Sequence, residues 1–149
     1  MHEGETVSAS YRLKVISTMA TILIVEDNAS FRHSLVSLLS QRFPSMTIVE
    51  TADGNEALQK VHVLAPDLVF MDIRLPGENG LELTRRIKEE HPKTIIVILT
   101  SHNLQEYREA AYRYGASHFL AKGTSSGEEI VRVVESIAPA SNASVDCTH

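Results

Sequence analysis

Three carboxylates in this sequence stand directly after runs of apolar residues. Glu26 and Asp27 follow the run "TILIV", and Asp72 follows the run "LVFM". Packed together, three such groups would repel one another and raise at least one pKa. A hard divalent cation such as Mg²⁺ relieves that repulsion, because it prefers one or two carboxylates together with waters and a phosphate oxygen.

Two more polar residues follow apolar runs later in the chain. Thr100 comes after Ile95–Leu99, and Lys122 comes after His118–Ala121. The threonine hydroxyl can donate a hydrogen bond to a phosphoryl oxygen. The lysine carries a compact positive charge that suits a carboxylate or a phosphate. With the three carboxylates, these residues predict a phosphoryl-transfer site, where positioning and charge neutralisation carry most of the catalysis.

One carboxylate of this set must accept the phosphoryl group. Asp72 is the best candidate, because it stands alone at its strand end and faces a loop. Glu26 and Asp27 are adjacent and form a natural metal-binding pair. An aspartyl phosphate is a known kind of covalent carboxylate intermediate.

The elements that position these residues alternate along the chain. Short apolar runs predict five strands, at Ile22–Val25, Thr47–Glu50, Leu68–Met71, Ile95–Leu99 and His118–Ala121. Apolar residues at helical spacing predict a helix after each strand, at Phe31–Leu39, Glu56–Leu64, Leu81–Glu90, Leu104–Tyr114 and Ser126–Ile137. Both assignments rest on the periods of 2 and 3.6 residues that distinguish strands from helices.

Finer features of these elements also follow from residue type. Asn28 or Ser30 is the expected N-cap of the first helix. Asp53-Gly54 predicts a turn. We expect Leu64 to face inward from the second helix. We also expect the stripe Leu104, Tyr107, Ala111 and Tyr114 to lie in the core, with Gly115 ending its helix.

This alternation predicts an α/β fold of three layers, a doubly wound parallel sheet of five strands with five helices. Ligands of such sheets bind at the carboxyl ends of the strands, where all the chemically active residues above are expected to meet. We expect one domain over residues 20–138, a flexible N-terminal extension over 1–19 and a flexible tail over 139–149.

Composition narrows the cellular setting. The 149 residues carry a formal charge of −5, and 43% are hydrophobic. The mild acidity predicts neither nucleic-acid binding by this chain nor attraction to a membrane surface. The single cysteine cannot form an internal disulfide, and no apolar run reaches the length of a signal sequence or a membrane span. We therefore expect a cytoplasmic protein.

The order acidic pair, aspartate, threonine and lysine, each at a strand end, resembles the receiver domain of two-component response regulators. The resemblance covers about residues 20–138 and rests on four elements in order, at Glu26-Asp27, Asp72, Thr100 and Lys122. It implies a flavodoxin-like fold with strand order 2-1-3-4-5. It also implies a signalling switch rather than an enzyme, one that catalyses only its own phosphorylation and dephosphorylation.

The resemblance assigns a role to each position. Asp72 would accept the phosphoryl group. Mg²⁺, or Mn²⁺ as an alternative, would bind Asp27 directly, Glu26 through water, Asp72, and the backbone carbonyl of Arg74.

Further roles concern the response to phosphorylation. Thr100 and Lys122 would contact the phosphoryl group, and Phe119 would turn inward as a switch residue. Arg74 and His102 occupy positions that tune dephosphorylation in this family.

The resemblance also implies partners. A sensor histidine kinase or a histidine phosphotransfer protein would donate the phosphoryl group. The face built by the fourth helix, fifth strand and fifth helix would be read by an unidentified downstream protein, or would form a homodimer. No direct contact with nucleic acid or membrane is expected of this chain.

Two positions depart from the common pattern of the family. Glu26 stands where aspartate is common, so we expect the water-mediated metal contact to shift slightly. Gly123 follows Lys122 where many receivers have proline, so we expect a trans peptide bond there.

Other functions stay open at this point. The chain could be a receiver excised from a DNA-binding regulator, or a pseudo-receiver that acts by binding alone. A haloacid-dehalogenase-type phosphatase would need a second aspartate two residues after Asp72, where this chain has Arg74. A flavodoxin would need a phosphate loop after the first strand, and a dinucleotide enzyme would need the motif Gly-x-Gly-x-x-Gly. The sequence contains neither the loop nor the motif.

Each residue taken alone also has an ordinary structural explanation. Asp72 could cap a turn and Asp27 a helix, Lys122 could be a surface lysine, and Phe119 could be a core aromatic. The histidines, His33, His62 and His91 among them, show no close metal-ligand spacing, and we expect surface residues there.

Overall fold

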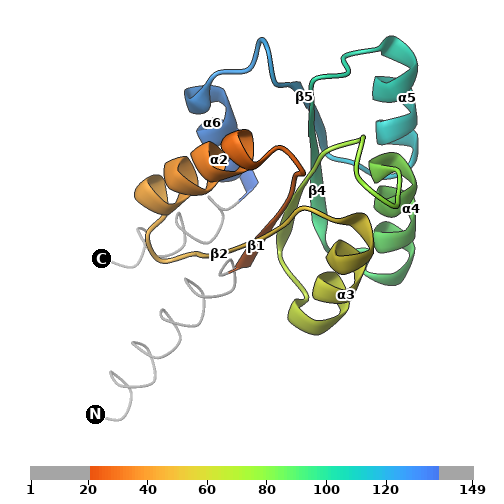
Figure 1. The fold of residues 1–149 in the computed structure, drawn as a ribbon, viewed down its shortest axis with the longest axis horizontal. Coiled ribbons are helices and arrows are strands. Elements are labelled where there is room, and N and C mark those ends of the chain that lie inside the picture. Colours follow the sequence, from red (N-terminus) through yellow and green to blue (C-terminus); the bar gives the residue numbers. More distant parts are fainter. Residues whose placement is uncertain (1–20, 138–149) are drawn as a thin grey trace, which may run out of the picture.

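The computed structural model describes residues 21–137 as a parallel sheet between two layers of helices (Figure 1). The extension and tail expected at 1–19 and 139–149 lie outside the described residues. The strands are β1 (Thr21–Val25), β2 (Thr47–Thr51), β3 (Leu68–Met71), β4 (Ile95–Thr100) and β5 (His118–Ala121). The helices are α2 (Ala29–Arg42), α3 (Gly54–Leu64), α4 (Gly80–Glu90), α5 (Gln105–Arg113) and α6 (Gly127–Ile137).

The strands pair in the order β2-β1-β3-β4-β5, and every pairing is parallel. Helices α2 and α6 cover one face of the sheet, and α3, α4 and α5 cover the other (Figure 1). The predicted three-layer fold, strand order and number of elements are confirmed. Among residues 21–137, no helix combines the length and the apolar character that a membrane span requires.

Alternate residues of each central strand enter two separate hydrophobic cores, as the period of a pleated strand requires. In β1, Leu23 and Val25 pack toward α3 and α4, whereas Ile22 and Ile24 pack toward α2 and α6. All four side chains are essentially inaccessible to solvent. A strand buried on both faces must be apolar throughout, which explains the uninterrupted runs in the sequence.

Polar caps fix where the helices begin. Asn28 is the N-cap of α2, since its side chain accepts a hydrogen bond from the amide of Phe31 at 2.9 Å. Asp53 caps α3 in the same way, accepting from the amide of Asn55 at 2.7 Å. The turn predicted at Asp53-Gly54 is therefore wrong: this carboxylate starts a helix, and Gly54 is already its first residue.

Two residues expected in the core are exposed. Leu64 is 40% exposed, because it is the last residue of α3 and the chain turns away at Ala65, whose φ is 47°. Leu104 is 46% exposed, because it is the extended N-cap of α5 and not part of the helix. The rest of that stripe packs against the core as predicted, and Gly115 ends the helix with a φ of 110°.

Candidate functional site

Backbone hydrogen bonds carry the strand ladder one residue beyond the strand ends. The amide of Glu26 donates to the carbonyl of Thr51 at 2.9 Å, and the amide of Asp72 donates to Val25 at 3.0 Å. The amide of Lys122 donates to Thr100 at 2.9 Å. These three side chains therefore start from fixed backbone positions at one edge of the sheet, as their sequence positions predicted.

Asp72 is almost fully buried, with 6% of its surface exposed. One carboxylate oxygen, Oδ1, accepts a hydrogen bond from the amide of Ile73 at 2.7 Å. The other, Oδ2, lies 3.1 Å from the Lys122 ammonium. Both oxygens are held by donors, so the orientation of the carboxylate is fixed.

A glycine at the start of α4 lies directly against the backbone of Asp72. The amide of Gly80 donates to the carbonyl of Ile73 at 2.7 Å. A Cβ at Gly80 would lie 1.9 Å from the carbonyl oxygen of Asp72, which no side chain can occupy. The absence of a side chain at Gly80 therefore lets α4 begin directly against the loop that follows β3.

Lys122 joins the carboxylates of Glu26 and Asp72. Its Nζ lies 2.5 Å from Glu26 Oε1, and it sits 4.6 Å from the centre of the Phe31 ring. Burial by itself would lower the pKa of Lys122, but the hydrogen bond to Glu26 and the two nearby negative charges outweigh burial and raise it. The ammonium therefore stays charged at this edge of the sheet.

Glu26 is only 3% exposed, and burial raises its pKa above the ordinary value. The hydrogen bonds from Lys122 and from the amide of Asn28, at 2.9 Å, act in the opposite direction but do not cancel the effect of burial. The charge of Asp72 raises the pKa further. A carboxylate in this state gains from any additional cation nearby.

The donor set fits a hard divalent ion. One carboxylate oxygen from each of Glu26, Asp27 and Asp72 lies within 4.8 Å of the other two. Asp27 is exposed while the other two are buried, so the cluster opens to solvent on the Asp27 side. The cluster offers negatively charged oxygen ligands and is open to water on one side. This matches the preference of Mg²⁺ for a few carboxylates together with retained waters.

An open pocket of about 600 Å³ adjoins the carboxylates on the Asp27 side. Arg74 lies at its wall, where its backbone pairs with Asn79 in an isolated antiparallel bridge. The side chain of Arg74 is exposed. The residues around the pocket are Asp27, Ile73, Arg74, Leu75, Glu78, Asn79 and Tyr107.

The residues expected to respond to phosphorylation lie on β4 and β5. Thr100 is fully buried, and its hydroxyl oxygen accepts a hydrogen bond from the amide of His102 at 3.2 Å. Phe119 is 4% exposed, with the Arg108 guanidinium 4.7 Å from its ring centre. No peptide bond is cis among residues 21–137, so Lys122–Gly123 is trans as expected.

Several contributors to this site were missed from the sequence. Asn28 donates its amide to Glu26, and Arg32 donates to the backbone carbonyl of Glu26 at 2.8 Å. Phe31 was used only as part of the apolar spacing that predicts the first helix, yet its ring also faces the Lys122 ammonium. The spacing of a capping asparagine two residues after a buried glutamate was a readable signal, whereas the contacts of Phe31 and Gly80 depend on residues far away in the sequence.

Comparison with known proteins identifies what this arrangement resembles. Residues 22–135 match the family model described as "Response regulator receiver domain". A protein-glutamate methylesterase/protein-glutamine glutaminase of Geobacillus kaustophilus is 38% identical over 103 residues, which are 68% of this chain and 29% of that protein. The DNA-binding transcriptional regulator NtrC of Klebsiella pneumoniae is 35% identical over 115 residues, 77% of this chain and 24% of that protein.

Solved structures agree with the sequence comparison. A two-component response regulator of the LuxR family from an Aurantimonas species has 33% sequence identity and a TM-score of 0.74, over 82% of this chain and 86% of that chain. The two curated relatives are much longer, since the matched part is only 24% and 29% of their lengths.

Proposed function

Because this chain belongs to the response regulator receiver family, we propose that it accepts a phosphoryl group on Asp72 and passes the signal on by a change of surface. The observation that carries the proposal is the setting of Asp72. This carboxylate is 6% exposed, lies 3.1 Å from Lys122, and belongs to a cluster with the oxygens of Glu26 and Asp27.

The chemical step uses an Asp72 oxygen as the nucleophile. This oxygen attacks the phosphorus of a phosphohistidine, the P–N bond breaks, and the leaving imidazole nitrogen takes up a proton. The donor is a sensor histidine kinase or a histidine phosphotransfer protein, as for receiver domains in general. Lys122 supports the step, because its charge lies beside the oxygens where negative charge gathers.

A divalent ion fits the carboxylates at this edge. Receiver domains generally bind Mg²⁺ at their acidic pocket, and Asp27, Glu26, Asp72 and the carbonyl of Arg74 would hold the ion here. When bound, it supplies positive charge that neutralises the carboxylates and the phosphoryl oxygens. Mn²⁺ is the alternative ion for the same oxygen ligands.

The phosphorylated Asp72 carries a charge of about −1.5 to −2 on its phosphoryl oxygens, in place of the single negative charge of the free carboxylate. In the unphosphorylated structure the Thr100 hydroxyl oxygen accepts a hydrogen bond from the amide of His102. We propose that the charge of the phosphoryl group draws this hydroxyl toward Asp72. Phe119 follows, and because its ring contacts Arg108 of α5, the movement reaches the face of α5, β5 and α6. A small bias between two arrangements of this face is enough to control a partner.

The remaining assignments belong to the same proposal. Residues 20–138 form the receiver, the protein acts in the cytoplasm, and the α5-β5-α6 face binds a downstream protein or a second copy of the chain. Arg74 and His102 tune the loss of the phosphoryl group by water. The relatives include a methylesterase and a DNA-binding regulator, so their likeness supports the receiver role without favouring one output.

The test is intact-mass measurement after incubation with a small-molecule phosphodonor, with and without Mg²⁺. We expect a gain of one phosphoryl group that requires the ion and is absent in Asp72→Asn. Asp67→Asn is the matched control, since Asp67 caps the opposite end of the sheet by accepting from the amide of Thr21 at 3.3 Å. The control variant should gain the phosphoryl group as the wild type does.

Two results would contradict the proposal. Phosphorylation of the Asp72→Asn variant at the wild-type rate would place the acceptor elsewhere. No gain in the wild type, from either the small donor or a panel of phosphorylated histidine phosphotransfer proteins, would favour a pseudo-receiver that acts by binding alone.

A further inference from the structure

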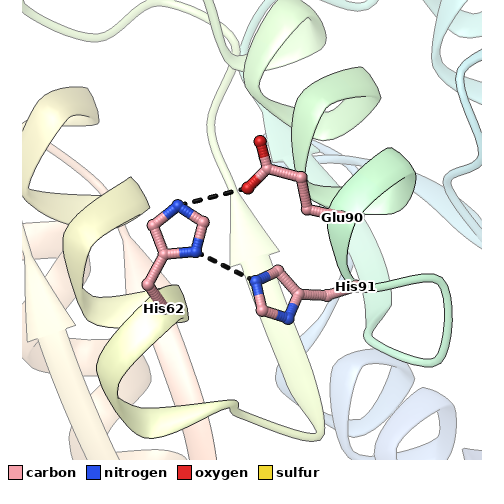
Figure 2. Close-up of side chains that lie close together, drawn as sticks. All are labelled: His62, Glu90 and His91. Atoms are coloured by element: carbon pink, nitrogen blue, oxygen red, sulfur yellow. Dashed lines mark hydrogen bonds and ion pairs between the residues drawn. The ribbon is translucent and has the colours of Figure 1, made fainter.

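The C-terminal ends of α3 and α4 bring two histidines and a glutamate together. His62 lies in the last turn of α3, Glu90 is the last residue of α4, and His91 is the C-cap of α4. Figure 2 shows the three side chains facing one another from the two helices. His91 is followed by the short loop into β4, so this cluster lies at the strand-start edge of the sheet, opposite Asp72.

The contacts of His62 give the cluster its geometry. His62 Nδ1 lies 3.0 Å from His91 Nε2, and His62 Nε2 lies 3.2 Å from Glu90 Oε1. The two partners therefore approach opposite nitrogens of the same ring (Figure 2). The side chains of His62 and Glu90 are 46% and 51% exposed, so the cluster is open to ions from solvent.

We propose that His62 and His91 bind a divalent transition-metal ion, Zn²⁺ in the first place, with Glu90 orienting the His62 ring. Two nitrogens that bind one tetrahedral Zn²⁺ at about 2.0–2.1 Å lie about 3.3 Å apart. His62 Nδ1 and His91 Nε2 are 3.0 Å apart. Only a small opening of this pair is needed, and water completes the coordination.

The proton positions are consistent with such a site. His62 can donate from Nε2 to the Glu90 carboxylate, which leaves a lone pair on Nδ1 for the ion. In the metal-free protein His91 donates from Nε2 to His62 Nδ1. When the ion binds, His91 carries its proton on Nδ1 instead and offers Nε2 as the second ligand. A carboxylate that accepts from the far nitrogen of a metal-binding histidine fixes the tautomer and the ring orientation, and losing it weakens metal binding by about 10–100-fold.

The electrostatic surroundings also favour a cation. Both helices end here, and the C-terminal end of a helix carries a partial negative charge from its unpaired carbonyl groups. Glu90 adds a full negative charge. Lys88, two residues before Glu90, directs its ammonium at backbone carbonyls rather than at the Glu90 carboxylate. Its Nζ donates to the carbonyls of Pro92 and Thr94, each at 2.7 Å.

The chemistry of the ligands separates this cluster from the carboxylates around Asp72. Imidazole nitrogens suit Zn²⁺, Cu²⁺ and Ni²⁺, whereas an all-oxygen set suits Mg²⁺. An ion held between His62 and His91 would also tie α3 to α4. Because the unfolded chain does not preserve this arrangement, binding would stabilise the folded state by mass action.

The first experiment is isothermal titration of the full chain, free of any polyhistidine tag, with Zn²⁺ in the presence of excess Mg²⁺. We expect one zinc ion per chain, and loss of that binding event in His62→Ala and in His91→Ala. Glu90→Gln should bind about 10–100-fold more weakly. His33→Ala is the control, because His33 is an exposed histidine on α2 outside the cluster, and it should bind as the wild type does.

Thermal unfolding gives an independent readout. Zinc at a tenfold excess over its dissociation constant should raise the Tm of the wild type and of His33→Ala by about 4 °C. The two cluster variants, folded by circular dichroism, should show no such rise. Unchanged zinc affinity in both His62→Ala and His91→Ala would overturn the site, because zinc would then bind elsewhere. Wild-type affinity in Glu90→Gln would overturn the role of Glu90.

Discussion

Replacing Gly80 by alanine tests whether the start of α4 sets the position of Asp72. A Cβ at this residue would lie 1.9 Å from the carbonyl oxygen of Asp72 and 2.9 Å from the Cα of Ile73. Contacts between a carbon and a carbonyl oxygen begin at about 3.3 Å. The loop after β3 and the first turn of α4 must therefore separate by about 1.4 Å in the Gly80→Ala variant.

This displacement has two measurable consequences. A misplacement of about 1 Å at a reacting group costs about 10²-fold in rate, so the rate of phosphorylation from a small-molecule donor should fall by that order. Forcing a methyl group into occupied space should lower the free energy of unfolding by about 1–3 kcal/mol. Without the clash, the same change within a helix would instead raise it by about 0.5–1 kcal/mol.

Time-resolved intact-mass measurement gives the rate, and urea unfolding gives the stability. Gly123→Ala is the matched control, because a Cβ there meets no atom within 4 Å. The control should change stability by less than about 0.5 kcal/mol and keep the wild-type rate. A Gly80→Ala variant that is more stable than the wild type and is phosphorylated at the wild-type rate would refute the reasoning.

Three further predictions follow from single contacts. Lys122→Met leaves the buried Glu26 and Asp72 without their cation. Urea unfolding in EDTA at pH 7 should therefore show that the free energy of unfolding falls by about 1–3 kcal/mol, less than for a fully enclosed pair because the Asp27 side is open to solvent. An unchanged free energy of unfolding would contradict this. The pKa of Glu26 is raised in the folded state by burial, so its contribution to stability is fully present below its unfolded pKa and is lost as the pH rises through the folded value. In EDTA the wild type should therefore lose more stability than Glu26→Gln between about pH 4.5 and 7, as chemical unfolding at each pH can measure; parallel pH profiles would count against it. Ala65 is the one non-glycine residue with a positive φ among residues 21–137, and it precedes a proline. Relief of the left-handed strain, partly offset by the greater entropy of glycine in the unfolded chain, means that Ala65→Gly should raise the free energy of unfolding by about 0.5–1 kcal/mol in urea. A loss of stability would show that the backbone there is not strained.

The sequence by itself determined the architecture, because the rules involved are local. Runs such as Leu68–Met71 are apolar at every position, as a strand covered on both faces requires. Helical spacing between such runs leaves a parallel sheet as the arrangement that buries both. The same logic placed Glu26, Asp72, Thr100 and Lys122 at one edge, since parallel strands all end on the same side.

Local rules failed where a residue lies at the end of an element. Leu64 and Leu104 fit the apolar spacing of their helices, yet one ends α3 and the other precedes α5, so neither packs inward. Asp53 looked like a turn residue because aspartate followed by glycine suits both a turn and a helix start. Only the neighbouring amide groups decide between the two uses of that carboxylate.

Several contacts between distant residues were decided by the tertiary structure alone. Gly80 touches the backbone of Asp72 because α4 begins directly against the loop after β3. Lys122 reaches Asp72 across 50 residues of sequence, and His62 reaches His91 across 29. The lysine was predictable because strand ends share an edge, but no comparable rule brings two helix ends together. Their meeting depends on how α3 and α4 pack on the sheet, a property of the whole core that no single stretch of sequence encodes.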